Sequence, residues 1–354
     1  QNYLDFGDME DWPFCGVDRV LMFSGGIDSL AGAVQTARAG CKTVLVSHRS
    51  APALDSRQRR LFRELDEKYP AQMVHIPVWI NKEKRLGQES TQRTRSFLYS
   101  TLGTIVAESI RGDGVRFFEN GIVSINLPVA DEALRARASR TTHPRALHLF
   151  AQFYSLVANR KLQLDNPFLF STKAEIVASI AENGAGDLIE YTCSCGYPMF
   201  KSRTQWHCGN CSQCIDRRFA TVASGCSQYD RVTDYVSDVF TGPRKDGYQK
   251  NIAVDYVRHG VDLQRMSEME IASKFNSELS RAVRFEKKPS EAAQRLIKMH
   301  KQHGENVVQV LRHELGRRSG ELLCAGLDQS SLLSMAVGGK HLEPSWKSYC
   351  ARIV

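Results

Sequence analysis

The sequence lacks several features that would place the chain in an easily recognised class. No apolar run approaches the roughly 20 residues that span a bilayer, so no membrane helix and no membrane partner are predicted. No secretory signal peptide is visible. Internal repeats and low-complexity tracts are also absent, which excludes a repeat architecture.

The bulk composition is that of a soluble globular protein. Of its residues, 42% are hydrophobic and 24% are charged. The length of 354 residues is enough for one large or two ordinary domains. The formal net charge of +8 suits a nucleotide, a nucleic acid or an acidic protein surface, although basic surfaces also serve solubility alone. The first residue is Gln1 rather than Met, so residues 1–16 are interpreted as a segment that ends an upstream region.

Strands and helices alternate through the first two thirds of the chain. Apolar runs predict strands at 17–23, 42–47, 73–78 and 115–121. Helical spacing of apolar residues predicts helices at 28–40, around 61–65, and at 96–111, 147–157 and 173–182. This alternation predicts an α/β fold with a doubly wound parallel sheet, in which ligands bind beyond the carboxyl ends of the strands.

The pattern changes after about Gly225. From Arg231 to the end there are 20 Lys and Arg against 15 Asp and Glu, and the apolar spacing is helical at 266–285, 290–304 and 305–315. We therefore divide the chain into residues 17–228, a nucleotide-type domain, and residues 229–354, a basic helical region that packs on the sheet or docks a partner.

A short polar loop joins the first predicted strand to the first helix. It reads Ser24-Gly25-Gly26-Ile27-Asp28-Ser29. Glycines allow the backbone to approach a phosphate closely, the serine hydroxyls can donate hydrogen bonds, and the helix N-terminus favours an anion. Asp28 sits where a carboxylate can help to hold Mg²⁺ with a triphosphate. No Gly-Lys-Ser/Thr follows, so this is not a Walker loop; it is typical of PP-loop enzymes, which split ATP between its α- and β-phosphates.

Half of the ten cysteines lie within 22 residues, at 193–214. Four thiolates, Cys195, Cys208, Cys211 and Cys214, have the spacing of a closed tetrahedral Zn²⁺ site, which is structural rather than catalytic. An iron–sulfur cluster is the chemical alternative. Cys193 either replaces Cys195 as a ligand or is a free thiol. Clustering of this kind indicates metal binding in a reducing compartment, so we expect a cytoplasmic protein.

The two motifs in this order resemble the 7-cyano-7-deazaguanine synthases of the queuosine pathway, over roughly residues 17–223. The resemblance also includes His48 with Gln58-Arg59-Arg60, Asn120-Gly121-Ile122-Val123, Pro167 with Lys173-Ala174-Glu175-Ile176, and Thr192-Cys193-Ser194-Cys195 followed by Cys208, Cys211, Cys214 and Arg217. The family pattern assigns Cys195, rather than Cys193, as the metal ligand.

The resemblance implies that ATP adenylates a 7-carboxy-7-deazaguanine carboxylate and releases pyrophosphate, after which ammonia attacks and a second activation gives the nitrile. Positive side chains would neutralise the departing pyrophosphate, unless they are solvated surface residues. The roles predicted on this basis are catalysis by Asp28, Ser29 and Lys173, ATP binding by Ser24, Gly25, Gly26, Asp28, Ser29, His48 and Gly121, and substrate binding by Arg95, Thr142, His143 and Glu175.

The chain departs from that family in three places. Gln92-Arg93-Thr94-Arg95 replaces the family's Pro-Gly-Arg-Asn, residues 140–144 replace its Tyr-Pro-Asp-Cys-Arg substrate loop, and residues 229–354 are additional. This combination is more similar to the synthase-like proteins of bacterial anti-phage operons, in which a protein amine is thought to replace ammonia as the nucleophile. The predicted partners are then a deazaguanine carboxylate, a protein substrate from the same operon, and a second copy of the chain.

Three other functions stay open at this point. The first is the housekeeping synthase that uses ammonia. The second is a tRNA thiolase, which would use Cys193 and whose tRNA acceptor suits the positive net charge. The third is a non-catalytic nucleotide fold that recruits a partner through its basic helices.

Overall fold

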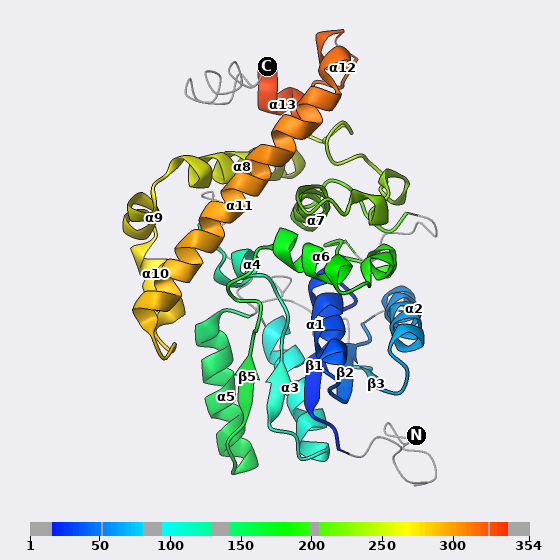
Figure 1. The fold of residues 1–354 in the computed structure, drawn as a ribbon, viewed down its shortest axis with the longest axis vertical. Helices are drawn as coiled ribbons and strands as arrows, with labels where there is room; N and C mark the ends of the chain where they lie inside the picture. The colour runs from blue at the N-terminus through cyan, green and yellow to red at the C-terminus, as the bar shows by residue number, and fades with distance from the viewer. Residues whose placement is uncertain are drawn as a thin grey trace, which may run out of the picture.

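The computed structural model describes residues 16–50, 52–80, 94–128, 142–197, 205–324 and 326–338. It contains a five-stranded, all-parallel sheet in the order β3-β2-β1-β4-β5 (Figure 1). The strands are β1 (Arg19–Met22), β2 (Thr43–His48), β3 (Met73–Val78), β4 (Gly114–Arg116) and β5 (Gln163–Asp165). The predicted doubly wound α/β fold is confirmed.

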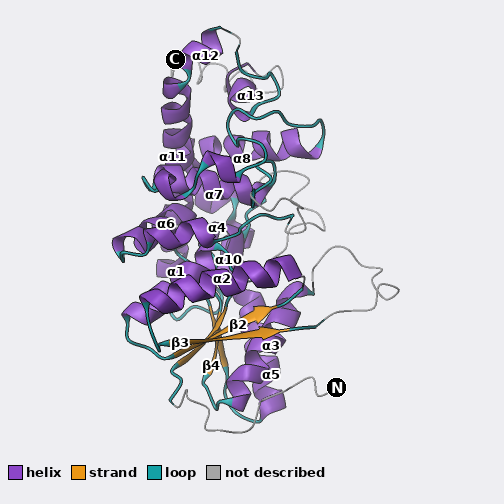
Figure 2. Ribbon diagram, turned by 90° about the vertical axis from the view of Figure 1, so that its right-hand side faces the viewer, coloured by secondary structure: helices purple, strands orange, loops and turns teal. Residues whose placement is uncertain are grey.

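Helices cover both faces of the sheet (Figure 2). Alternate residues of β1 point to opposite faces, so Leu21 and Phe23 pack with α1, whereas Val20 and Met22 pack with α3 and α5. Burial on both faces explains the continuous apolar run of this strand. The helices of this region are α1 (Ile27–Arg38), α2 (Pro52–Lys68), α3 (Arg95–Ser109), α4 (Gly121–Ile125), α5 (Pro144–Ala158), α6 (Lys173–Glu182) and α7 (Ser212–Ala223), with 3₁₀ turns η2 (Gly186–Tyr191), η3 (Ser227–Tyr229) and η4 (Val232–Asp234).

Two details of the sheet differ from the sequence prediction. The strand expected at 115–121 ends at Arg116, and Gly121 begins α4 instead. Asn120 caps that helix, because its side-chain oxygen accepts a hydrogen bond from the Val123 amide. Strand β5 was not predicted, since three residues are too few for a periodic signal.

The C-terminal region is helical, as predicted. Its helices are α8 (Tyr248–Arg265), α9 (Glu268–Lys274), α10 (Asn276–Val283), α11 (Pro289–Arg317), α12 (Ser319–Leu323) and α13 (Leu332–Gly338). The helix expected at 266–285 is in fact two helices, α9 and α10, which separate at Phe275. None of the helices within the described ranges combines the length and apolar character needed to cross a bilayer.

The helix break predicted at Gly304 is wrong, because α11 runs straight through it (Figure 1). A Cβ atom at Gly304 would lie 2.6 Å from the amide nitrogen of Gln264 and 2.7 Å from the carbonyl oxygen of Gly260, both in α8. The glycine therefore permits the close approach of two helices rather than ending one.

The C-terminal helices share a buried core with the cysteine segment. Cys211 and Phe219 pack in the same apolar cluster as Val257 of α8 and Val307 of α11. The boundary at residue 228 stays a prediction, and this cluster extends across it.

Candidate activation site and cysteine cluster

Three strand ends meet where the strand order of the sheet reverses. β1 lies between β2 and β4, and in sheets of this kind ligands bind where the loops after two such neighbouring strands diverge. Asp28 follows β1 in the first turn of α1, Asn120 follows β4, and Lys173 follows β5 as the first residue of α6. The topology thus brings together three polar side chains that lie far apart in the sequence.

Direct contacts join these three residues. The Oδ2 atom of Asp28 accepts hydrogen bonds from the backbone and side-chain nitrogens of Asn120, at 3.1 and 2.8 Å. The Nζ atom of Lys173 lies 3.5 Å from the other carboxylate oxygen of Asp28. Asp28 and Lys173 are both largely buried, with 9% and 5% of their surface exposed. The structure therefore brings together two of the three predicted catalytic residues.

Asp216 of α7 is a second carboxylate partner of Lys173. Its Oδ2 atom lies 3.1 Å from Lys173 Nζ. Burial alone would lower the pKa of Lys173, but Asp28 and Asp216 together raise it above its usual value, so the ammonium is charged. The sequence analysis missed Asp216. In the sequence Asp216 is followed by Arg217 and Arg218, so it looks like part of an ordinary charged stretch.

The Ser24–Ser29 loop has the form of an anion cradle. Gly25 adopts a positive φ of 83°, which favours glycine. Gly26 is the N-cap of α1 and supplies no side chain to its first amides, so these donors are available to a phosphate. The hydroxyl of Ser29 donates to the carbonyl oxygen of Gly26 at 2.8 Å, and Ser24 Oγ lies 3.3 Å from Ser29 Oγ.

His48 and Arg95 meet at a different point, around Tyr99. The edge of the His48 ring packs against Tyr99, with the ring centroids 5.7 Å apart, and His48 Nε2 lies 2.9 Å from the Ile80 carbonyl oxygen. The Arg95 guanidinium donates to the Tyr99 hydroxyl at 3.2 Å. Their predicted roles in ATP and substrate binding stay predictions. Gln92, Arg93, Arg140 and Thr141, which also belong to the predicted departures, lie outside the described residues.

The remaining predicted residues have local structural contacts. A Cβ atom at Gly121 would lie 2.0 Å from the carbonyl oxygen of Leu169, so glycine is needed for two loops to pack. Thr142 donates to the carboxylate of Glu119, and His143 caps α5. Glu175 caps α6, because its carboxylate accepts from the amide of Thr172 at 2.7 Å. Binding roles for these side chains stay predictions.

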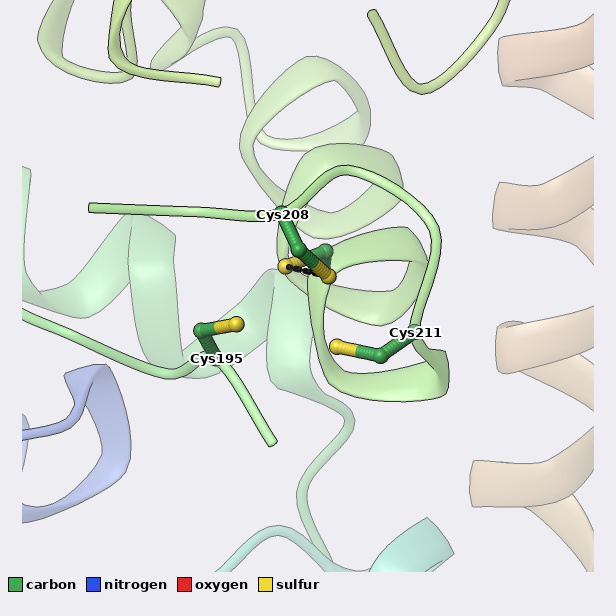
Figure 3. A group of neighbouring side chains, drawn as sticks. Cys195, Cys208 and Cys211 are labelled. Atoms are coloured by element: carbon green, nitrogen blue, oxygen red, sulfur yellow. Dashed lines mark hydrogen bonds between the residues drawn. The ribbon is translucent and has the colours of Figure 1, made fainter. Parts of the chain in front are cut away.

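The four predicted metal ligands form one cluster. The Sγ atoms of Cys195, Cys208, Cys211 and Cys214 all lie within 4.8 Å of one another and are largely buried. Figure 3 shows the labelled cysteines pointing their sulfurs into a shared space. Contacts with the other three sulfurs lower the pKa of Cys208 and raise that of Cys214, because thiolates this close cannot all be charged without a cation. An all-sulfur donor set of this size fits structural Zn²⁺.

Cys193 is outside the metal cluster and lies beside the phosphate loop. Its backbone amide donates to the Gly25 carbonyl oxygen at 2.8 Å. Its Sγ atom accepts a hydrogen bond from Arg57, at 3.2 Å. The four-sulfur group thus contains Cys195 and not Cys193, and the role of Cys195 as a metal ligand stays a prediction.

Comparison with known proteins agrees with this geometry. Residues 142–225 match the family model described as "Queuosine biosynthesis protein QueC". This segment is QueC-like. It carries Lys173, the cysteine cluster and Asp216, whereas the Ser24–Ser29 loop lies before it. No curated protein matches the chain. The match supports a PP-loop type of ATP-dependent activation chemistry.

Proposed function

We propose that the chain activates a 7-deazaguanine carboxylate with ATP and transfers it to an amine. The observation that carries this proposal is the Lys173 ammonium, held 3.5 Å from Asp28 and 3.1 Å from Asp216 next to the first turn of α1. A fixed positive charge beside a phosphate-binding helix terminus suits the departure of pyrophosphate.

The proposed reaction has two steps. A carboxylate oxygen of the substrate attacks the α-phosphorus of ATP, the bond to the β-phosphate oxygen breaks, and pyrophosphate leaves. An amine nitrogen then attacks the acyl carbon of the adenylate, loses a proton, and displaces AMP to give an amide. ATP is consumed as a substrate, and no redox partner is required.

Each residue has a defined task in this scheme. The amides of the first turn of α1 and the hydroxyls of Ser24 and Ser29 bind phosphate oxygens. Lys173 offsets the negative charge that develops on pyrophosphate. The Oδ1 atom of Asp28 is buried, lies 3.5 Å from Lys173 Nζ and accepts no hydrogen bond from a described residue, which fits a carboxylate that would hold Mg²⁺ with the triphosphate. Zinc on the four cysteines would hold the adjoining segment in place.

We further propose that the accepting amine belongs to a protein and that the chain acts in anti-phage defence. The basic C-terminal region and the departures from the synthase pattern support this choice over ammonia. The alternative of a non-catalytic binder is disfavoured because the loop, Lys173 and Asp28 are all present and in contact.

Mass spectrometry distinguishes these outcomes. The protein is incubated with ATP, Mg²⁺ and 7-carboxy-7-deazaguanine, with ammonia or with a candidate partner protein supplied in turn. We expect pyrophosphate, AMP and a mass increment on the partner, equal to the acyl group. A nitrile formed from ammonia alone would assign the housekeeping reaction, and the absence of pyrophosphate release in every arm would overturn the proposal.

One observation favours a second candidate, a tRNA thiolase. Cys193 presents a thiol beside the phosphate loop, with Arg57 3.2 Å from its sulfur. Pyrophosphate release that requires tRNA, together with a thiolated tRNA product that is lost in Cys193→Ser, would favour the thiolase. Release that proceeds without tRNA would exclude it.

A further inference from the structure

The C-terminal helices contact the activation site through a tyrosine. Tyr256, in α8, donates a hydrogen bond from its hydroxyl to Asp216 Oδ1 at 3.3 Å. The other oxygen of Asp216 faces Lys173 and accepts no hydrogen bond from any described residue besides this ion-pair contact. A continuous line of contacts therefore runs from α8 through Asp216 to the ammonium of Lys173.

The ring of Tyr256 is held in place on two sides. Phe219 of α7 packs edge-on with its centroid 5.0 Å away, and His303 of α11 packs at 89° with its centroid 5.7 Å away. One turn further along α8, a Cβ atom at Gly260 would lie 2.5 Å from Val307, so α8 and α11 are in close contact. Tightly packed helices have little freedom to shift, which fixes the position of the hydroxyl.

We propose that Asp216 and Tyr256 are positioning residues of the activation site. Asp28 holds one side of the Lys173 ammonium and Asp216 holds the other, while Tyr256 fixes the orientation of Asp216. The helical region 229–354 thus supplies a part of the activation machinery, in addition to any role in partner docking. This inference rests on the proposed function for its kinetic consequence, but not for its effect on ATP binding.

The geometry gives each variant a distinct expected effect. Asp216→Asn removes one of the two carboxylates that place the ammonium, so the maximal rate of pyrophosphate release falls, by about tenfold or more. The same change removes a negative charge near the triphosphate, so ATP binds with higher affinity. A purely structural defect would instead lower the folded fraction and weaken ATP binding.

Tyr256→Phe removes only the hydroxyl. We expect a fall in rate of about fivefold, the effect of one hydrogen bond of ordinary strength. If Tyr256 acts through Asp216, then adding Tyr256→Phe to Asp216→Asn causes no further loss, whereas independent effects would multiply.

Tyr154→Phe is the matched control. Its hydroxyl also makes a buried hydrogen bond, to Ser100 at 2.8 Å, but it lies between α3 and α5. Tyr154→Phe removes the same atom at a point outside the activation site. The rate of pyrophosphate release per folded molecule should therefore equal that of the wild type.

The experiment measures pyrophosphate release and the affinity for Mg²⁺–ATP in the full-length wild type, the three single variants and the double variant. The expected result is a lower maximal rate with tighter ATP binding in Asp216→Asn, and no additional loss in the double variant. Equal rates in Tyr256→Phe and Tyr154→Phe, or multiplicative effects in the double variant, would overturn the inference while leaving the proposed function intact.

Failure of the proposed function has a different signature. The wild type would then release no pyrophosphate, and the inference is judged on ATP binding alone. Tighter Mg²⁺–ATP binding in Asp216→Asn, with Tyr154→Phe unchanged, supports the placement of Asp216 at the phosphate site. Unchanged or weaker binding in Asp216→Asn overturns it.

Discussion

The backbone amide of Cys193 donates a hydrogen bond to the carbonyl oxygen of Gly25, at 2.8 Å. The cysteine segment and the phosphate loop are therefore directly connected, although 168 positions separate the two residues in the sequence. Gly25 has a positive φ, one of several conformations that glycine adopts freely, so contacts such as this one select it. A metal that orders the cysteine segment thus also supports the loop.

Metal removal is expected to weaken nucleotide binding. Zinc bound to four thiolates contributes directly to folding, and its loss would release the segment that contacts Gly25. In Cys211→Ser we expect a lower unfolding temperature together with an affinity for Mg²⁺–ATP reduced by about tenfold, the scale of a disrupted metal site. Calorimetric titration with ATP measures this, and Cys41→Ser, outside the cluster, is the control. Metal-free protein that binds ATP normally would contradict the connection.

The metal content should distinguish two cysteines that lie two residues apart. Cys195 belongs to the four-sulfur group, whereas the Cys193 sulfur faces Arg57. Elemental analysis of purified protein should show about one zinc per chain in Cys193→Ser, and a clear loss in Cys195→Ser. Equal zinc content in both variants would show that the two thiols substitute for each other.

Replacement of Lys173 should affect activity and stability separately. Lys173→Met leaves two buried carboxylates without their cation, which costs about 3–5 kcal/mol in the free energy of unfolding. Pyrophosphate release should fall by about a hundredfold or more. The double variant Lys173→Met/Asp216→Asn removes one of the unpaired charges, so it should regain stability but not activity. Chemical denaturation and a pyrophosphate assay measure the two effects, and recovered activity in the double variant would argue against a role for Lys173 in the chemistry.

A buried histidine predicts how stability depends on pH. Burial lowers the pKa of His300, in α11, from 6.5 to about 4. Between these values the unfolded chain binds the proton and the folded chain does not. Stability is therefore complete above about pH 6.5 and decreases as the pH falls towards 4, by about 2 kcal/mol at pH 5.

Variants of α11 test this assignment. His300→Leu should reduce the loss of unfolding free energy between pH 7 and pH 5 by about 2 kcal/mol. The other histidines with a lowered pKa, His75, His207, His259 and His303, should retain the rest of the pH dependence. His313→Leu, an exposed position on the same helix, should leave it unchanged. A wild-type unfolding free energy that is the same across this range would show that His300 does not resist protonation.

Two glycines of α11 should respond in opposite directions to alanine. At Gly304 the added Cβ would lie 2.6 Å from the backbone of α8, so Gly304→Ala should destabilise the protein by about 2–3 kcal/mol. At Gly316 there is no atom within 4 Å of the added Cβ, so Gly316→Ala should stabilise it by about 0.5–1 kcal/mol. Thermal unfolding measures both, and a tolerated Gly304→Ala would mean that α8 and α11 are not packed this closely.

Local signals in the sequence were enough to predict the fold class. The strand at 73–78 and the helix at 173–182 have the predicted bounds, because each is a periodic apolar segment with clear ends. The spacing of Cys208, Cys211 and Cys214 predicted three metal ligands, since thiolates separated by two residues suit a single tetrahedral ion. The family resemblance selected Cys195 over Cys193 as the fourth, and the structure groups these four sulfurs. The same local signals wrongly predicted a helix end at Gly304. A glycine that ends a helix and one that allows a neighbouring helix to approach cannot be distinguished from the sequence alone.

By itself the sequence determined the β/α alternation, the phosphate loop at 24–29 and the cysteine cluster, all of which depend on residues close together in the chain. Only the tertiary structure decided that Asp216 contacts Lys173 and that Tyr256 contacts Asp216. These contacts depend on how α6, α7 and α8 pack against one another, and packing register between distant helices leaves no periodic trace in the sequence. The tertiary structure also decided that the Cys193 amide donates a hydrogen bond to the Gly25 carbonyl oxygen. The sequence could not predict this bond, because it uses backbone atoms that every residue has.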